Sequence, residues 1–193
     1  MLKLSKSVTL GSKSPRRQEL LKLIVPSFDI YTMDVDESFD ELKDTLAEVA
    51  PYLSKKKADH IFPFINQNNL LITSDSVVIK GNKIYNKPED YAEAIKMLTE
   101  LQDGSHYVYT GVTITSNVKQ ETFTCITEVE FTLITDKELD YYITQFKPFD
   151  KAGAYGIQDW IGANFISKIT GSYTNVMGLP TQELYVRLKG WEG

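Results

Sequence analysis

The sequence predicts a mixed α/β fold, a sheet flanked by helices, on two observations. Segments with helical spacing of apolar residues alternate with short apolar strands through roughly the first half of the chain. Beyond them, His106–Thr115 and Glu121–Ile134 alternate apolar and polar residues, which predicts two long strands paired through Ser116-Asn117. Long antiparallel strands argue against a purely parallel, doubly wound sheet. We therefore expect a mixed sheet in a single domain, residues 1–193.

A strand, a turn and a helix are predicted near the start of the chain. The residues Ser7-Val8-Thr9-Leu10 favour a short strand, and Ser14 stands where the N-cap of the following helix belongs. Pro15 suits the first helical position, where its missing N–H leaves no hydrogen bond unmade. One apolar face of this helix is formed by Leu20, Leu21, Leu23 and Ile24.

Two arginines occupy the first turn of this helix. Arg16 and Arg17 lie at the end of the helix dipole that disfavours cations. Together with backbone N–H groups and the hydroxyls of Ser12 and Ser14, they suit the binding of an anion. An ordinary surface turn whose arginines face water is the alternative. The pattern G-x-x-x-x-G-K-[ST] is absent, so the turn is not a Walker A loop.

Helices and strands follow in turn along the rest of the chain. Helical spacing runs from Asp40 to Ile65, and Pro51 suits the first turn of a second helix within it. Gly104 is expected to end a later helix. The other predicted strands are Phe28–Met33, Leu70–Thr73, Val77–Ile79, Ile84–Tyr85 and Asn164–Ile169. The other predicted helices are Glu89–Leu101, Asp136–Phe146 and one opened by residues 175–180 that runs to about Leu188.

Asp75 is the residue that points most directly to chemistry. It follows an apolar strand, where a buried carboxylate is costly unless it is paired or binds a metal ion. Three roles stay open: a metal ligand, a general base, or a turn aspartate. Asp36 and Glu37 could add a second carboxylate, and one or two carboxylates completed by substrate phosphates suit Mg²⁺. The candidate cations for phosphate oxygens are Lys57, Lys87 and Lys151, whereas Lys55 and Lys56 are expected to face solvent.

The composition argues against several classes of protein. A net charge of -5 disfavours binding to a nucleic-acid polymer, and Cys125, the only cysteine, cannot form a disulfide within the chain. His60 and His106 lack zinc-binding spacing. We expect a cytoplasmic protein that does not enter a membrane, since no long apolar run and no signal-peptide pattern is evident.

A series of motifs, in the same order and over nearly the whole chain, resembles the Maf-like nucleoside triphosphate pyrophosphatases. A single motif would be weak, but the ordered set is specific. The motifs are Ser12-x-Ser14-Pro15-Arg16-Arg17-x-Glu19-Leu20-Leu21, Asp36-Glu37, Lys57-Ala58, Ser74-Asp75-Ser76-Val77-Val78, Lys87-Pro88, Gly104-x-His106-x-Val108-x-Thr110-Gly111-Val112, Lys151-Ala152-Gly153-Ala154-Tyr155-Gly156-Ile157-Gln158 and Gly171-Ser172-Tyr173-x-Asn175-Val176-x-Gly178-Leu179-Pro180.

The resemblance implies cleavage between the α- and β-phosphates of a nucleoside triphosphate, which yields the monophosphate and pyrophosphate and depends on Mg²⁺ or Mn²⁺. It also implies a strongly twisted, two-lobed α/β fold like that of inosine triphosphate pyrophosphatases, with the site in a cleft, and often a homodimer. The segments Ala154–Gln158 and Gly171–Tyr173 resemble the branch that acts on dTTP and UTP. The branch that acts on 7-methyl-GTP carries a glutamate-containing segment instead.

Site roles follow from the same resemblance, position by position. Asp75 is implied to be the proton acceptor and, with Glu37, to lie near the metal ion. The implied phosphate-binding residues are Ser12, Arg16, Lys57 and Lys87. The positions tied to base choice are Arg17, Ser76 and Gln158.

The sequence departs from the family pattern in places, and two other functions stay open. Ser74-Asp75-Ser76 replaces the commoner Ala-Asp-Thr, so Ser76 keeps the hydroxyl but lacks the methyl group. Asp159-Trp160-Ile161-Gly162 and Thr181 also differ. The alternative functions are house-cleaning of modified pyrimidine nucleotides and non-catalytic regulation of septum formation. A carboxylate kept among phosphate-binding cations favours an enzyme.

Overall fold

The computed structural model describes residues 2–39 and 45–191, which form two compact units. Unit 1 comprises residues 1–75, 110–125 and 178–193, and unit 2 comprises residues 76–109 and 126–177. Each unit is therefore assembled from segments that are distant in sequence. The first residues of the helical region expected from Asp40, residues 40–44, lie outside the described residues.

The strands form a mixed sheet, which confirms the predicted fold class. Their hydrogen-bonded order is β2-β1-β3-β5-β6-β7, with β4 paired to β3. The β1 strand pairs in parallel with β2 and β3, whereas the β3–β4 and β6–β7 pairs are antiparallel. The bounds are β1 Val8–Leu10, β2 Asp29–Ile30, β3 Leu70–Lys80, β4 Lys83–Tyr85, β5 Gly104–Thr115, β6 Gln120–Phe131 and β7 Ile166–Thr170.

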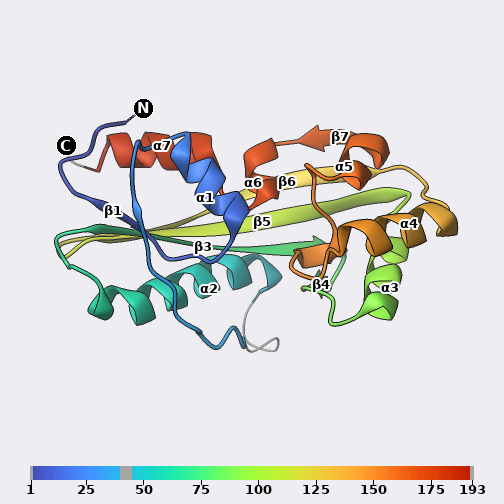
Figure 1. The fold of residues 1–193 in the computed structure, drawn as a ribbon, viewed down its shortest axis with the longest axis horizontal. Coiled ribbons are helices and arrows are strands. Elements are labelled where there is room, and N and C mark those ends of the chain that lie inside the picture. The colour runs from blue at the N-terminus through green and yellow to red at the C-terminus, as the bar shows by residue number, and fades with distance from the viewer. Residues whose placement is uncertain (1, 40–44, 192–193) are drawn as a thin grey trace. The chain divides into compact units, whose positions relative to one another are not determined.

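Unit 1 carries helices on both faces of its part of the sheet. Helices α1 (Pro15–Lys22) and α7 (Thr181–Lys189) lie on one face, and α2 (Leu46–Ile61) lies on the other (Figure 1). A short 3₁₀ turn, η1 (Phe62–Phe64), follows α2. Ser14 is the N-cap residue of α1 and Pro15 is its first residue, as the sequence predicts.

The prediction that Pro51 opens a second helix is wrong, because α2 continues through it. The reason lies in the contact with β5. A Cβ at Gly111 would overlap the backbone of Ala50 and Pro51, so helix and strand backbones touch there. Proline has no N–H, so this close contact buries no unpaired donor at that position.

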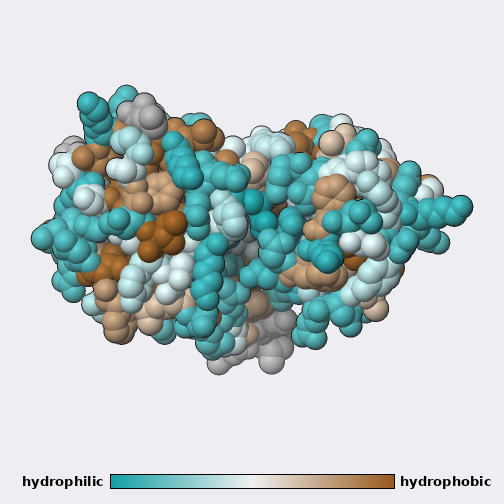
Figure 2. All heavy atoms as spheres, viewed as in Figure 1, coloured by the Kyte–Doolittle hydropathy of each residue, from teal (hydrophilic) through white to brown (hydrophobic). Residues whose placement is uncertain are grey.

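Unit 2 contains α3 (Tyr91–Leu101), η2 (Ala152–Ala154), α4 (Asp136–Phe146), α5 (Trp160–Phe165) and α6 (Tyr173–Met177). Its core joins the apolar faces of α3 and α4 to β5 and β6, with Leu98, Val129 and Tyr142 among the buried side chains. Asp90 caps α3 by accepting the N–H of Glu93 at 2.8 Å, and Thr135 with Glu138 forms a capping box on α4. On the visible face of each unit, apolar side chains are interspersed with hydrophilic ones (Figure 2).

Several predicted boundaries differ from the structure. Only residues 29–30 of the predicted strand Phe28–Met33 form a strand. The left-handed residue after α3 is Asp103, whose φ is 49°, and Gly104 instead begins β5. Helix α5 precedes β7 where one strand was expected, and the last predicted helix is split into α6 and α7. No helix within residues 2–39 and 45–191 has the length and apolar character needed to cross a membrane.

Candidate functional site

The turn between β1 and α1 is held close to β3. Gly11 allows this approach, because a Cβ there would lie 2.7 Å from Cγ2 of Thr73. Ser12 is buried, and its Oγ accepts the backbone N–H of Ser14 at 3.2 Å. The two serines that the sequence predicts for substrate binding are thus joined to each other, ahead of the first turn of α1.

Arg17 is fixed to the backbone of the C-terminal segment of unit 1. Its Nε donates to the carbonyl oxygen of Gly178 at 2.9 Å, and Oγ of Ser74 donates to the same oxygen at 3.0 Å. Burial lowers the pKa of Arg17, while the negative charge of Asp75 acts to raise it and that of neighbouring Arg16 to lower it. The second arginine of the motif is therefore a partly buried anchor as well as a charge near Asp75.

Asp75 lies inside a strand rather than in a turn, which excludes the turn-aspartate alternative. The strand β3 runs unbroken through residues 74–76, and Asp75 is only 8% exposed. Its Oδ1 forms an ion pair with Nζ of Lys57. The same Nζ lies 2.8 Å from Oε1 of Glu37, so one ammonium group bridges the two predicted metal-binding carboxylates.

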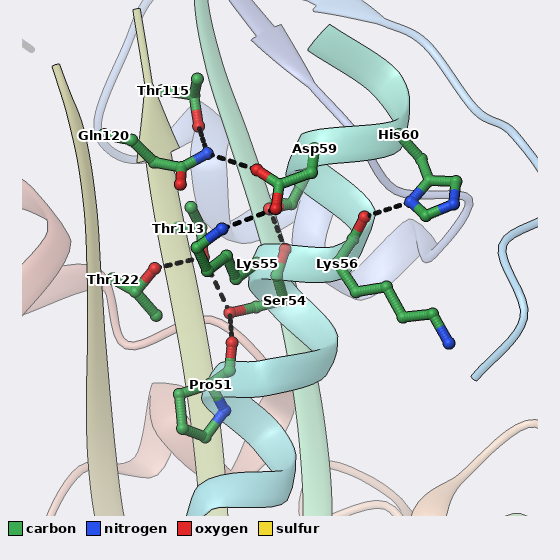
Figure 3. Close-up of polar contacts among 11 residues, drawn as sticks. Pro51, Ser54, Lys55, Lys56, Asp59, His60, Thr113, Thr115, Gln120 and Thr122 are labelled. Carbon is green, nitrogen blue, oxygen red and sulfur yellow. Dashed lines mark hydrogen bonds and ion pairs between the residues drawn. The ribbon is translucent and has the colours of Figure 1, made fainter. Parts of the chain in front are cut away.

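A row of hydroxyl contacts joins α2, the helix that carries Lys57, to the sheet (Figure 3). Oγ of Ser54 lies 2.9 Å from both the carbonyl oxygen of Pro51 and Oγ1 of Thr113. Thr113 continues the row to Thr122 at 2.9 Å. Because Ser54 is buried one turn before Lys57, the helix cannot rotate without breaking these bonds.

The three consecutive lysines of α2 have different partners. Lys55 is exposed and pairs with Asp59 at 2.6 Å. The prediction that Lys56 faces solvent is wrong: its side chain is 19% exposed, and its Nζ lies 3.4 Å from Asp36. Lys56 also donates to the carbonyl oxygen of Ser38 at 3.3 Å. Successive positions on a helix point about 100° apart, so only Lys57 reaches Asp75 while Lys56 holds the segment that carries Glu37.

Unit 2 carries Lys87, Ser76 and Gln158, whereas Arg16 is half-buried in the first turn of α1 in unit 1. Lys87 is exposed after β4, and the carbonyl oxygen of the preceding Asn86 accepts the N–H of Gly153 at 3.1 Å. Gln158 is exposed and Ser76 is half-buried. Lys151 pairs with Asp150 at 2.9 Å and lies 3.7 Å from Asp159. One backbone hydrogen bond thus ties the Lys87 turn to the segment that leads to Gln158.

The histidines do not belong to this cluster. His60 is exposed on α2, while His106 is buried in unit 2 with Nε2 at 2.7 Å from the hydroxyl of Tyr155. Burial, assisted by the charge of Lys80, lowers the pKa of His106 to about 3, so its ring is neutral at pH 7. Within the described part of the chain, no group of three or more His, Cys, Asp or Glu residues is arranged to hold a metal ion.

Comparison with known proteins identifies the family. A family model described as "Maf-like protein" matches residues 7–191. The chain belongs to the Maf-like protein family. This Maf-like protein is 45% identical to the dTTP/UTP pyrophosphatase of Christiangramia forsetii, over 94% of this chain and 92% of the relative. It is 42% identical to the dTTP/UTP pyrophosphatase of Bacteroides thetaiotaomicron, over 94% of each chain.

Two contacts in this Maf-like protein could not be predicted from the motifs. The carbonyl oxygen of Gly178 joins Arg17 to Ser74, although Arg17 and Gly178 are 161 positions apart in sequence. Lys56 joins α2 to the Asp36 segment. The glycine in Gly178-Leu179-Pro180 was visible as part of a motif, but only the fold shows that its carbonyl is the shared acceptor.

Proposed function

We propose that this Maf-like protein is a nucleoside triphosphate pyrophosphatase that hydrolyses dTTP and UTP to the monophosphate and pyrophosphate. The names of its relatives support this substrate pair. One observation of the structure carries the proposal: the ammonium of Lys57 contacts the carboxylates of both Asp75 and Glu37. A buried carboxylate beside lysine and arginine side chains suits attack by water on a polyphosphate.

Hydrolysis adds one water molecule across the anhydride bond between the α- and β-phosphates. In the proposed reaction, Asp75 accepts a proton from the water molecule as the water oxygen attacks the phosphate. The anhydride bond to the leaving pyrophosphate then breaks. Arg16 neutralises phosphate oxygens together with Lys57 and Lys87, since phosphoryl transfer depends mainly on positioning and charge. The hydroxyls of Ser12 and Ser14 add hydrogen-bond donors at the start of α1.

Asp75 and Glu37 fit a divalent ion as its protein ligands. Their oxygens already converge on a single cationic group, the ammonium of Lys57. With only two carboxylates, the remaining ligands would be water and phosphate oxygens, the usual arrangement for Mg²⁺ in nucleotide enzymes. We propose Mg²⁺ or Mn²⁺ in this role, where the ion would supply charge neutralisation and orient the phosphates.

Base selection is proposed to depend on Gln158, with Arg17 and Ser76 contributing. Uracil and thymine present N3–H as a donor and O4 as an acceptor, which the carbonyl and NH₂ of a glutamine amide can match. Cytosine reverses both partners. A site that relies on such polar pairing discriminates strongly, because a mismatched base leaves polar groups unpaired.

A panel of nucleotides tests the proposal directly. Pyrophosphate release is measured with Mg²⁺ for dTTP, UTP, CTP and GTP, and for a modified pyrimidine triphosphate. We expect rapid turnover of dTTP and UTP, slow turnover of CTP and GTP, and a selective loss of dTTP and UTP turnover in Gln158→Glu. Equal rates with GTP and UTP would refute the pyrimidine assignment. Faster turnover of the modified nucleotide would favour house-cleaning, and no turnover at all would favour a non-catalytic role.

The remaining parts of the proposal concern the domain organisation, the oligomeric state and the cellular location of the protein. We propose that residues 1–193 act as one Maf-like domain, since the family match extends from residue 7 to residue 191. A homodimer is proposed from the family resemblance. A cytoplasmic location is proposed because nucleoside triphosphates are found there.

A further inference from the structure

We propose that Tyr142 and Asp159 position the backbone that carries Gln158, and that this positioning determines how strictly the pyrimidine base is selected. The inference rests on the proposed function, because it assumes that Gln158 meets the base. The residues that carry it all belong to unit 2. Neither Tyr142 nor Asp159 is among the residues that the sequence predicts for the site.

Three hydrogen bonds close the short segment around Gln158. The hydroxyl of Tyr142 donates to Oδ2 of Asp159 at 2.9 Å and accepts the backbone N–H of Gly156 at 3.1 Å. The backbone N–H of Asp159 donates to the carbonyl oxygen of Gly156 at 3.0 Å. Gln158 lies between the two residues that are tied together, so its Cα is held at both sides.

The contact between Gly156 and Asp159 requires a glycine. A Cβ on Gly156 would lie 2.5 Å from Oδ2 of Asp159, which is closer than van der Waals contact permits. The Asp159 side chain is 15% exposed, and the same Oδ2 lies 3.7 Å from Nζ of Lys151. The carboxylate is thus enclosed by a tyrosine, a lysine and the backbone of the segment that it restrains.

Tyr142 is a rigid support for this contact. The residue is fully buried on α4, and its ring stacks on Phe146 with centroids 5.2 Å apart. Burial and the neighbouring charge of Asp159 raise the pKa of Tyr142, so the hydroxyl keeps its proton and remains the donor. Tyr142 therefore remains a hydroxyl donor at neutral pH.

A fixed backbone matters because the Gln158 side chain itself is exposed. The amide of a long exposed side chain is positioned only through its Cα. Ordering such a side chain when the substrate binds costs conformational entropy. If the backbone could shift, the amide could move to accommodate the reversed partners of cytosine. A restrained backbone prevents this adjustment and leaves the mismatched groups unpaired.

Tyr142→Phe tests the positioning role, because it removes one hydroxyl and keeps the stacked ring. We expect the ratio of kcat/KM for UTP to that for CTP to fall by about two- to tenfold, the effect of one buried hydrogen bond. The loss should appear chiefly as a higher KM for UTP. Tyr141→Phe is the matched control: it is the adjacent residue, its ring packs on Trp160 at 5.0 Å, and the ratio should not change.

Asp159 provides a second, independent variant. Asp159→Ala removes the acceptor and should reproduce the loss of selectivity seen in Tyr142→Phe. Asp159→Asn retains an oxygen that can accept the Tyr142 hydroxyl, so it should restore most of the UTP preference. Equal selectivity in Asp159→Ala and the unaltered protein would overturn the proposal.

Hydrogen exchange gives a measure that is independent of substrate. The amide of Gly156 should exchange faster in Tyr142→Phe and at the normal rate in Tyr141→Phe. The inference is wrong if the unaltered protein prefers UTP and Tyr142→Phe keeps that preference, or if turnover of every triphosphate falls by the same factor. If the unaltered protein releases no pyrophosphate from UTP, the proposed function fails, and the selectivity role fails with it. Measuring the unaltered protein therefore separates a failure of the proposed function from a failure of the selectivity role.

Discussion

Nζ of Lys57 lies 2.8 Å from Oε1 of Glu37 while it also pairs with Asp75. Lys57 comes from a helix, Asp75 from a strand and Glu37 from a segment outside any helix or strand, so the cluster exists only in the folded unit. The Lys57 and Asp75 side chains are 14% and 11% exposed, whereas that of Glu37 is 48% exposed. Glu37 is thus the member of the cluster whose change of partner would cost the least desolvation energy.

Asp75→Asn should reduce the turnover of UTP by at least about a hundredfold, in line with the loss of a general base. The amide has nearly the shape of the carboxylate, and Lys57 keeps its contact with Glu37, so the fold should be retained. Pyrophosphate release and thermal unfolding measure the two effects. A variant with near-normal turnover would contradict the role given to Asp75.

Lys57→Ala should weaken turnover by roughly ten- to a hundredfold, since it removes a charge-assisted contact of about 1.5–3 kcal/mol. Lys55→Ala is the control. Lys55 lies on the same helix with an exposed side chain paired to Asp59, so its removal should leave turnover nearly unchanged. Lys56→Ala should reduce turnover by an intermediate factor, because it removes the contacts of Lys56 with Asp36 and with the carbonyl oxygen of Ser38, next to Glu37. Equal effects at Lys55 and Lys57 would show that the lysine roles are wrongly assigned.

Gly111→Ala should destabilise unit 1, because the added methyl group would overlap the backbone of α2 at Ala50 and Pro51. We expect a loss of about 1–3 kcal/mol in the free energy of unfolding, measured by urea denaturation. At Gly190 the nearest atom to an added Cβ is 3.7 Å away, so Gly190→Ala serves as the control. Equal stability of the two variants would argue against the close contact.

His106 should make stability fall as the solution becomes acidic. Burial holds its pKa in the folded chain at about 3, below the ordinary value of 6.5, so the unfolded chain binds a proton first. Between these values the free energy of unfolding should lose up to about 1.4 kcal/mol per pH unit through this group. In His106→Gln the dependence on pH over this range should be shallower, while His60→Gln, at an exposed position, should leave it unchanged.

Periodicity and capping residues in the sequence predicted most helices, because these signals are local. Helix α4 begins after Thr135 as expected, and Ser14 with Pro15 marks the start of α1. Pro51 was misinterpreted because the backbone that it contacts, at Gly111, is distant in sequence. A local pattern could not reveal that a strand backbone lies against the helix at that point.

The candidate site was predictable as a set of residues but not as a set of contacts. The motifs singled out Asp75, Lys57 and Glu37, and the structure joins them. The partly buried position of Lys56 was missed, because a run of lysines on a helix usually faces solvent and nothing local indicates Asp36 as a partner. The roles of Lys87 and Gln158 remain predictions, since each side chain is exposed in unit 2.

The hydrogen bond from Arg17 to the carbonyl of Gly178 has a consequence for synthesis of the chain. Arg17 leaves the ribosome 161 residues before its acceptor does, and Ser74 shares the same partner. Translation at about 5–20 residues per second leaves this arginine without that acceptor for roughly eight to thirty seconds. Unit 1 can therefore reach its final form only after translation has passed Gly178, and a nascent chain stalled before that point should remain sensitive to protease.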